Sequence, residues 1–344
     1  MNRSEGPVLE KEGSRKRRRA GARTWTERFT ALAPLWTLLV LGIVFGFGSG
    51  GSFLRTVNLN NILIQSSPLA ILATGMTFVL LTGEIDLSIA AVMGLTGMIA
   101  ARLYLDLEIP EPWAVLVALL CATGLGLVNG VVSMRFRIPT FMTTLAMSMI
   151  ADGLNQWVSG GKTIFQLSTL VQDIGSARIG GDDSLLRVMT AIAIGTLLVG
   201  LLVLRFTRFG RYVYKSGASK SAARLAGVNV NMVIISCLTI CGFLSGVAGV
   251  VMAGHLGSAL PTSIPSFLIE TIAAVVLGGT ALTGGRGSMF LTAVGVLIYE
   301  TLRNGLDNIT SINNFMKVFI TGLVLLVALI VNVVFSGHRE RDLA

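Results

Sequence analysis

The sequence RFTRFGRYVYKSGASKSAARLAGV, residues 205–228, is a long charged stretch between two blocks of almost unbroken apolar sequence. It contains six basic residues and no carboxylate. A Lys or Arg at the centre of a bilayer costs roughly 3 kcal/mol even on a lenient insertion scale, so this stretch must lie in water. Because basic loops stay on the cytoplasmic side, we expect it in the cytoplasm.

The composition is that of a membrane protein with several spans. Of the 344 residues, 53% are hydrophobic and only 13% are charged, and the mean hydropathy is +0.75. The 40 glycines fit this class, because small residues let helices approach closely in lipid. The net charge of +9 does not indicate a nucleic-acid partner, since the basic residues lie between apolar runs and carry no binding motif.

Ten apolar runs predict an all-α protein with about ten transmembrane helices. A basic tail at 1–30 is expected to be disordered in the cytoplasm, followed by a transmembrane domain at 31–335 and a short cytoplasmic tail at 336–344. The runs are approximately 31–47, 62–82, 87–105, 113–134, 138–158, 188–204, 230–254, 267–283, 289–302 and 315–335.

The distribution of Lys and Arg predicts the orientation. With the N-terminus inside, the expected cytoplasmic segments hold 20 of the 27 basic residues. An odd number of spans would move either the basic N-terminus or residues 205–228 outside. We therefore expect both termini in the cytoplasm of a multi-pass protein.

Residues 82–88, TGEIDLS, place two acids between two spans with almost no loop. One interpretation is a tight cytoplasmic turn with solvated acids, in which Asp86 or Ser88 caps the next helix. The other is a broken helix that lines a polar pathway, because irregular backbone at membrane depth must be satisfied by protein or water. In that case Glu84, Asp86 and Ser88 are candidate pathway residues.

A second break is expected at 278–288, GGTALTGGRGS. Both breaks contain Leu-Thr-Gly, at 81–83 and 282–284, followed by Ser and an apolar run. Such an echo is typical of a duplicated transporter half. Gly284 and Gly285 are therefore added to the candidate pathway and helix-break residues.

Other polar residues do not indicate an enzyme, a metal site or a bound cofactor. Cys237 and Cys241 lie in an apolar run without His or carboxylate neighbours, which favours buried thiols over a metal site. The GGKT at 160–163 lacks the earlier glycine of a P-loop, because Gln156 stands there. ATP hydrolysis would need another chain.

Two classes of transporter remain. One is a secondary carrier driven by an ion gradient, with Glu84 and Asp86 as the coupling acids; the other is the membrane subunit of a pump with a separate ATPase. Residues 205–228 favour the second class, because Ser219 can cap a short helix at 220–226. Such a helix would be a rigid element on which an ATPase could dock. A basic loop that only fixes topology stays open as an alternative.

Four ordered motifs carry a resemblance to the permease subunits of ribose-type sugar ABC importers, within the branched-chain amino acid permease superfamily. The resemblance covers about residues 55–335. The motifs are TGEIDLSIAAVMGLTG (82–97), GLVNGVVSMRFRIPTFMTTLAM (126–147), TRFGRYVYKSGASKSAARLAGVNV (207–230) and ETIAAVVLGGTALTGGRGS (270–288).

The resemblance implies a type II-like permease of the bacterial inner membrane. Its expected partners are an ABC ATP-binding subunit that holds ATP and Mg, a periplasmic sugar-binding protein, and a second permease copy or paralogue. Its cargo would be a monosaccharide or related polyol. By the resemblance, Arg208, Gly210, Arg211, Gly217, Arg224 and Gly227 are expected to be ATPase-coupling residues. Ser219 is added to them as the cap of the short helix, and Gly210, Gly217 and Gly227 are expected to divide the segment.

The chain departs from the family pattern at three positions. The family usually has a small residue at Glu84, Asn at Ser219, and a pair of acids where this chain keeps only Glu270. These departures leave the identity of the transported sugar open and suggest that the chain belongs to a specialised branch of the family.

Overall fold

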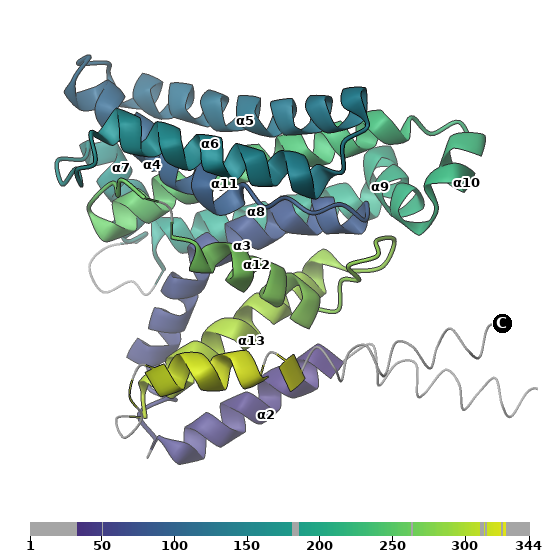
Figure 1. Ribbon diagram of the computed structural model, residues 1–344. Helices are drawn as coiled ribbons and strands as arrows, with labels where there is room; N and C mark the ends of the chain where they lie inside the picture. The colour runs from purple at the N-terminus through teal and green to yellow at the C-terminus, as the bar shows by residue number, and fades with distance from the viewer. Residues whose placement is uncertain are drawn as a thin grey trace, which may run out of the picture.

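The computed structural model describes residues 33–49, 51–180, 186–262, 264–309, 313, 315–324 and 326–327. The regular elements of this part are α-helices (Figure 1). They are α2 (Ala33–Gly48), α3 (Thr56–Leu81), α4 (Ile89–Leu105), α5 (Glu111–Phe136), α6 (Thr140–Ser159), α7 (Thr169–Ser176), α8 (Val188–Phe206), α9 (Arg208–Ala218), α10 (Lys220–Leu225), α11 (Val230–Leu256), α12 (Ser266–Leu277) and α13 (Met289–Asp307), with a further helix at Phe315–Val324.

The expected all-helical membrane architecture is found. Helices α3, α5, α8 and α11 are long and apolar enough to cross a membrane. Each of the other apolar runs also contains a helix, although these helices are shorter or less apolar. The expected tails at 1–30 and 336–344 lie outside the described residues.

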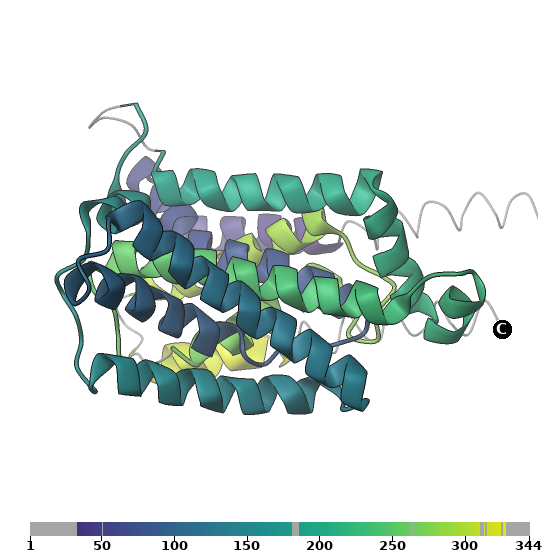
Figure 2. The same cartoon turned by 90° about the horizontal axis from the view of Figure 1, so that it is seen from above.

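Helices α3 and α11 form the centre of the bundle. The part of α3 from Ser66 to Leu81 is buried throughout, and α11 packs against α3, α4 and α5. At Gly126 of α5, a Cβ atom would lie 2.5 Å from the carbonyl oxygen of Leu238 on α11, so only glycine fits this crossing. The long helices run roughly along one direction when seen from above (Figure 2).

Helix α12 is shorter than the expected run at 267–283. It ends at Leu277, because Gly278 and Gly279 follow and Gly279 has a φ of +85°. Its 12 residues span only about 18 Å at 1.5 Å per residue, less than the roughly 30 Å of a hydrocarbon core. Helix α12 therefore cannot cross a bilayer alone.

The two ends of the bundle differ. Helices α9 and α10 and the two breaks at 82–88 and 278–288 lie at one end, to the right in Figure 1, whereas α7 lies at the other. The segments that the sequence placed in the cytoplasm thus gather together.

Candidate functional site

The two Leu-Thr-Gly triplets are in contact. The backbone N–H of Gly285 donates a 2.9 Å hydrogen bond to the carbonyl oxygen of Leu81. Gly83 and Gly284 have φ angles of +77° and +87°, and a Cβ at Gly284 would lie 2.6 Å from the nitrogen of Gly83. Glycine is needed at both positions, for its backbone conformation and for the close approach. The repeated Leu-Thr-Gly triplets therefore mark a direct contact between the two breaks, which we call the joint.

Helix α9 rests on this joint through Gly217. A Cβ at Gly217 would lie 1.9 Å from the carbonyl oxygen of Leu81 and 2.4 Å from the nitrogen of Gly285. Farther along α9, the hydroxyl of Tyr214 donates to the carbonyl oxygen of Gly287 at 3.0 Å. Burial raises the pKa of the Tyr214 hydroxyl above its usual range, so it stays protonated and able to donate. Both breaks are thus attached to α9.

An ion pair adds a second attachment. The ammonium group of Lys220 at the start of α10 bonds Oε1 of Glu84, and the hydroxyl of Thr140 donates to Oε2 at 2.6 Å. The Glu84 side chain is only 11% exposed, whereas that of Lys220 is 47% exposed. Lys220 and Thr140 were missed by sequence reasoning, because they are 136 and 56 residues away from Glu84.

Asp86 is not solvated, which corrects the first interpretation of the acids. It is 1% exposed, and its carboxylate accepts hydrogen bonds from the backbone N–H and the hydroxyl of Ser88 at 2.8 and 2.6 Å. The amide of Asn129 donates to the Ser88 hydroxyl oxygen at 3.0 Å. Ser88 does occupy the N-cap position of α4, but its side chain makes no capping bond. Asp86 is therefore buried and bonded within the break, whereas Glu84 is bonded to residues of other segments.

Residues 208–225 form two helices, α9 and α10, joined at Ser219. The Ser219 hydroxyl accepts from the N–H of Ala222 at 3.3 Å, so the predicted cap of the short helix is confirmed. Gly227 ends the segment with a φ of +77°. The prediction that Gly210 and Gly217 divide the segment is wrong, because both lie inside α9 and serve close packing instead.

The outer surface of this helix pair is basic and includes an exposed Leu. Arg208, Arg211 and Arg224 are exposed, and no carboxylate of the described residues forms an ion pair with them. Arg224 donates to the Asn231 side-chain oxygen at 3.4 Å. Leu225 is 91% exposed at the end of α10. Exposed cations around an exposed Leu are typical of a surface that meets an acidic partner.

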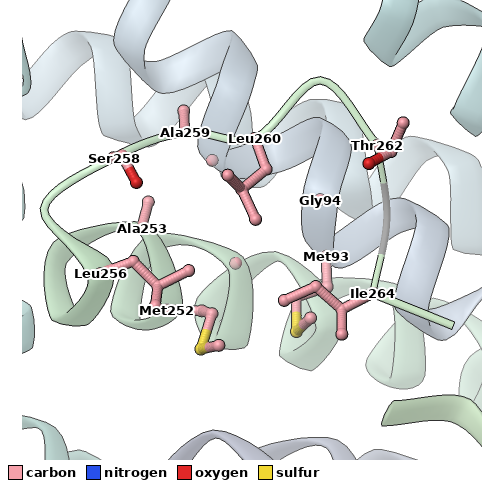
Figure 3. Close-up of a pocket in the computed structure, with 12 residues that line it drawn as sticks. Met93, Gly94, Met252, Ala253, Leu256, Ser258, Ala259, Leu260, Thr262 and Ile264 are labelled. Carbon is pink, nitrogen blue, oxygen red and sulfur yellow. The ribbon is translucent and has the colours of Figure 1, made fainter. Parts of the chain in front are cut away.

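A pocket lies near the other end of the bundle, between α4, α11 and the loop residues 258–262 and 264 (Figure 3). Its lining is mainly apolar, including Met93, Met252 and Leu260. The cavity measures about 30 Å³, which is enough for one or two water molecules but not for a monosaccharide. It is not a sugar site in this conformation.

Comparisons with known proteins give sequence matches over most of the chain. Residues 58–329 match the family described as branched-chain amino acid transport system / permease component. The chain is 34% identical to the ribose import permease protein RbsC of Escherichia coli (strain K12), covering 92% of this chain and 96% of the relative.

Two further relatives have similar coverage. The fructose import permease protein FrcC of Rhizobium meliloti is 36% identical, over 80% of this chain and 78% of its own. The D-allose transport system permease protein AlsC of Escherichia coli (strain K12) is 30% identical, over 85% and 88%. No solved structure matched the chain.

Proposed function

Because this chain belongs to the branched-chain amino acid transport system permease family, among its sugar ABC importer permeases, we propose that it couples a partner ATPase to sugar import through residues 205–228. Relatives of this kind are transport components, and the chain is a sugar-transport permease. The ATPase holds ATP and Mg, and a periplasmic binding protein delivers a monosaccharide or related polyol.

The contact of α9 with both helix breaks carries this proposal. Gly217 touches Leu81 and Gly285, and Lys220 is paired with Glu84. A force on α9 and α10 would therefore reach the end of α3 and the break between α12 and α13 through direct contacts. This is the mechanical link that an ATP-driven permease requires at its cytoplasmic face.

The surface chemistry indicates the kind of groove that receives the helix pair. Three exposed arginines favour an acidic rim, and Leu225 favours an apolar hollow. We place this groove on the ATP-binding subunit.

The remaining organisation follows the same proposal. About ten spans, with both termini inside, cross the bacterial inner membrane, and two permease copies or paralogues enclose the pathway between them. Substrate choice resides mainly in the binding protein, since the pocket between α4 and α11 cannot hold a sugar. An ion-driven carrier is not favoured, because Glu84 is ion-paired and Asp86 is buried and hydrogen-bonded.

Charge reversal on the exposed helix pair tests the proposal. The triple change Arg208→Glu, Arg211→Glu and Arg224→Glu is expected to lower uptake at least about tenfold, because like charges would face the acidic groove. Insertion should be normal, since all three side chains are exposed. Uptake and ATPase co-purification are measured per inserted copy.

Two controls separate docking from general charge effects. Replacement of the same three arginines by Lys keeps the charge and should retain most of the ATPase association. Lys162→Glu, between α6 and α7, should leave association unchanged. Normal ATPase association by the Glu triple variant would contradict the coupling assignment.

A further inference from the structure

Helices α12 and α13 carry a polar patch away from the coupling joint. It consists of Glu270 on α12 with Glu300 and Arg303 on α13. The two helices pack against each other (Figure 1), and Nη1 of Arg303 lies 3.6 Å from Oε2 of Glu270. Glu270 and Glu300 stand in the apolar runs 267–283 and 289–302 that the proposed topology places in the membrane, and Arg303 directly follows the second run.

One oxygen of each carboxylate in this patch lacks a hydrogen-bond donor within the part of the chain that the structure describes. Glu270 is 7% exposed and Glu300 is 1% exposed. Oε2 of each has no hydrogen-bond partner among the described residues, and the 3.6 Å separation from Arg303 is too long for a hydrogen bond. Buried acceptors without donors are costly. Donors from outside the chain would remove this cost.

Arg303 gives the patch an open side. Its side chain is 48% exposed, and its guanidinium lies beside the buried Glu270. An exposed Arg at the end of an apolar run cannot face hydrocarbon at low cost. Water or a polar solute must therefore reach it.

We propose that Glu270, Glu300 and Arg303 line the translocation pathway and bind the hydroxyl groups of the passing sugar. Sugar hydroxyls donate to the two free carboxylate oxygens and accept from the guanidinium, which matches the unfilled bonding capacity of the patch. This inference rests on the proposed function for the identity of the solute. The contact is weak and transient, as release to the cytoplasm requires.

Thiol labelling in intact membranes tests whether the patch is wet. In a Cys121→Ser background, the remaining cysteines are buried. Arg303→Cys and Ile269→Cys are treated with the water-soluble, charged reagent MTSET applied to both membrane faces. Ile269 is 68% exposed beside Glu270, and its replacement leaves the patch intact. Both variants should be labelled.

Leu198→Cys is the matched control for a lipid-facing position, because Leu198 is 54% exposed on the apolar helix α8. It should react at least about tenfold more slowly than Ile269→Cys. Equally slow labelling of Ile269→Cys, Arg303→Cys and Leu198→Cys would overturn the proposal, whether lipid or a second copy covers the patch.

Uptake by the complete transporter tests the sugar contact. Cells that carry the wild-type protein are first supplied with D-ribose, D-fructose or D-allose. The sugar that these cells accumulate is then used to measure uptake by the variants. Glu270→Gln and Glu300→Gln should each lower saturated uptake about tenfold per inserted copy, the effect of losing one hydrogen bond to a charged group. The loss should be smaller for a deoxy analogue of that sugar, a difference that a purely structural role would not produce.

Asp106→Asn is the control, because Asp106 is exposed at the end of α4 and paired with Arg102 at 3.1 Å. It should transport like wild type. Unchanged uptake by both Gln variants, or equal losses for the sugar and its deoxy analogue, would overturn the proposed contact. Failure of the wild type to retain an ATPase would instead refute the proposed function, while the labelling result still decides whether the patch is wet.

Discussion

Gly217→Ala is expected to abolish most uptake. The added methyl group would lie 1.9 Å from the carbonyl oxygen of Leu81 and 2.4 Å from the nitrogen of Gly285. Both atoms belong to backbone, so no side chain can move aside, and overpacking of this kind costs about 1–3 kcal/mol or more. Helix α9 must then move away from both breaks, and the contact of α9 with the end of α3 and with the break between α12 and α13 is interrupted.

The measurement is sugar uptake and sugar-stimulated ATP hydrolysis by reconstituted transporter, each per inserted copy. We expect uptake to fall by a factor of about ten or more, since 1.4 kcal/mol corresponds to tenfold. Gly195→Ala is the matched control, because a Cβ at this helical position meets no atom within 4 Å. Wild-type uptake by Gly217→Ala would contradict the role of the α9 contact.

The second large effect concerns the Glu84–Lys220 ion pair. Replacing Lys220 and replacing Glu84 should lower the stability of the protein by different amounts. Lys220→Met leaves the Glu84 carboxylate buried with only the Thr140 hydroxyl as a described hydrogen-bond partner. Glu84→Gln leaves Lys220 able to turn into water, because its side chain is 47% exposed. Lys220→Met should therefore be the more destabilising change, by about 1–3 kcal/mol.

A double-mutant cycle measures this asymmetry. Thermal unfolding in detergent and uptake are compared for Lys220→Met, Glu84→Gln and the double variant, which should recover part of the loss because no buried charge remains. Lys215→Met is the control for an exposed cation on the same segment. Additive losses in the double variant would show that the two side chains do not stabilise each other.

Local features of the site followed from the sequence because they depend on near neighbours. The Ser219 cap needs only the backbone three residues later, and the Leu-Thr-Gly echo is visible in the chain itself. The all-helical fold followed from the apolar runs for the same reason.

The long-range features did not follow. A glycine can end a helix or permit close contact between two helices, and the local sequence does not distinguish these roles. The packing of Gly217 against Leu81 depends on the fold of the whole chain. The burial of Asp86 likewise depends on the helices packed around the break, and the sequence allowed a solvated turn equally well. The Lys220–Glu84 pair joins residues 136 positions apart.

The most direct test of the coupling role is photo-crosslinking from Leu225 in intact membranes. A photoreactive phenylalanine analogue at this 91% exposed position should not disturb the fold. Illumination is expected to join the permease to a P-loop ATPase, identified by mass spectrometry, and the yield should drop in the Arg208→Glu, Arg211→Glu, Arg224→Glu background. Crosslinks to lipid alone, or an unchanged yield in that background, would contradict the proposal that residues 205–228 dock the ATPase.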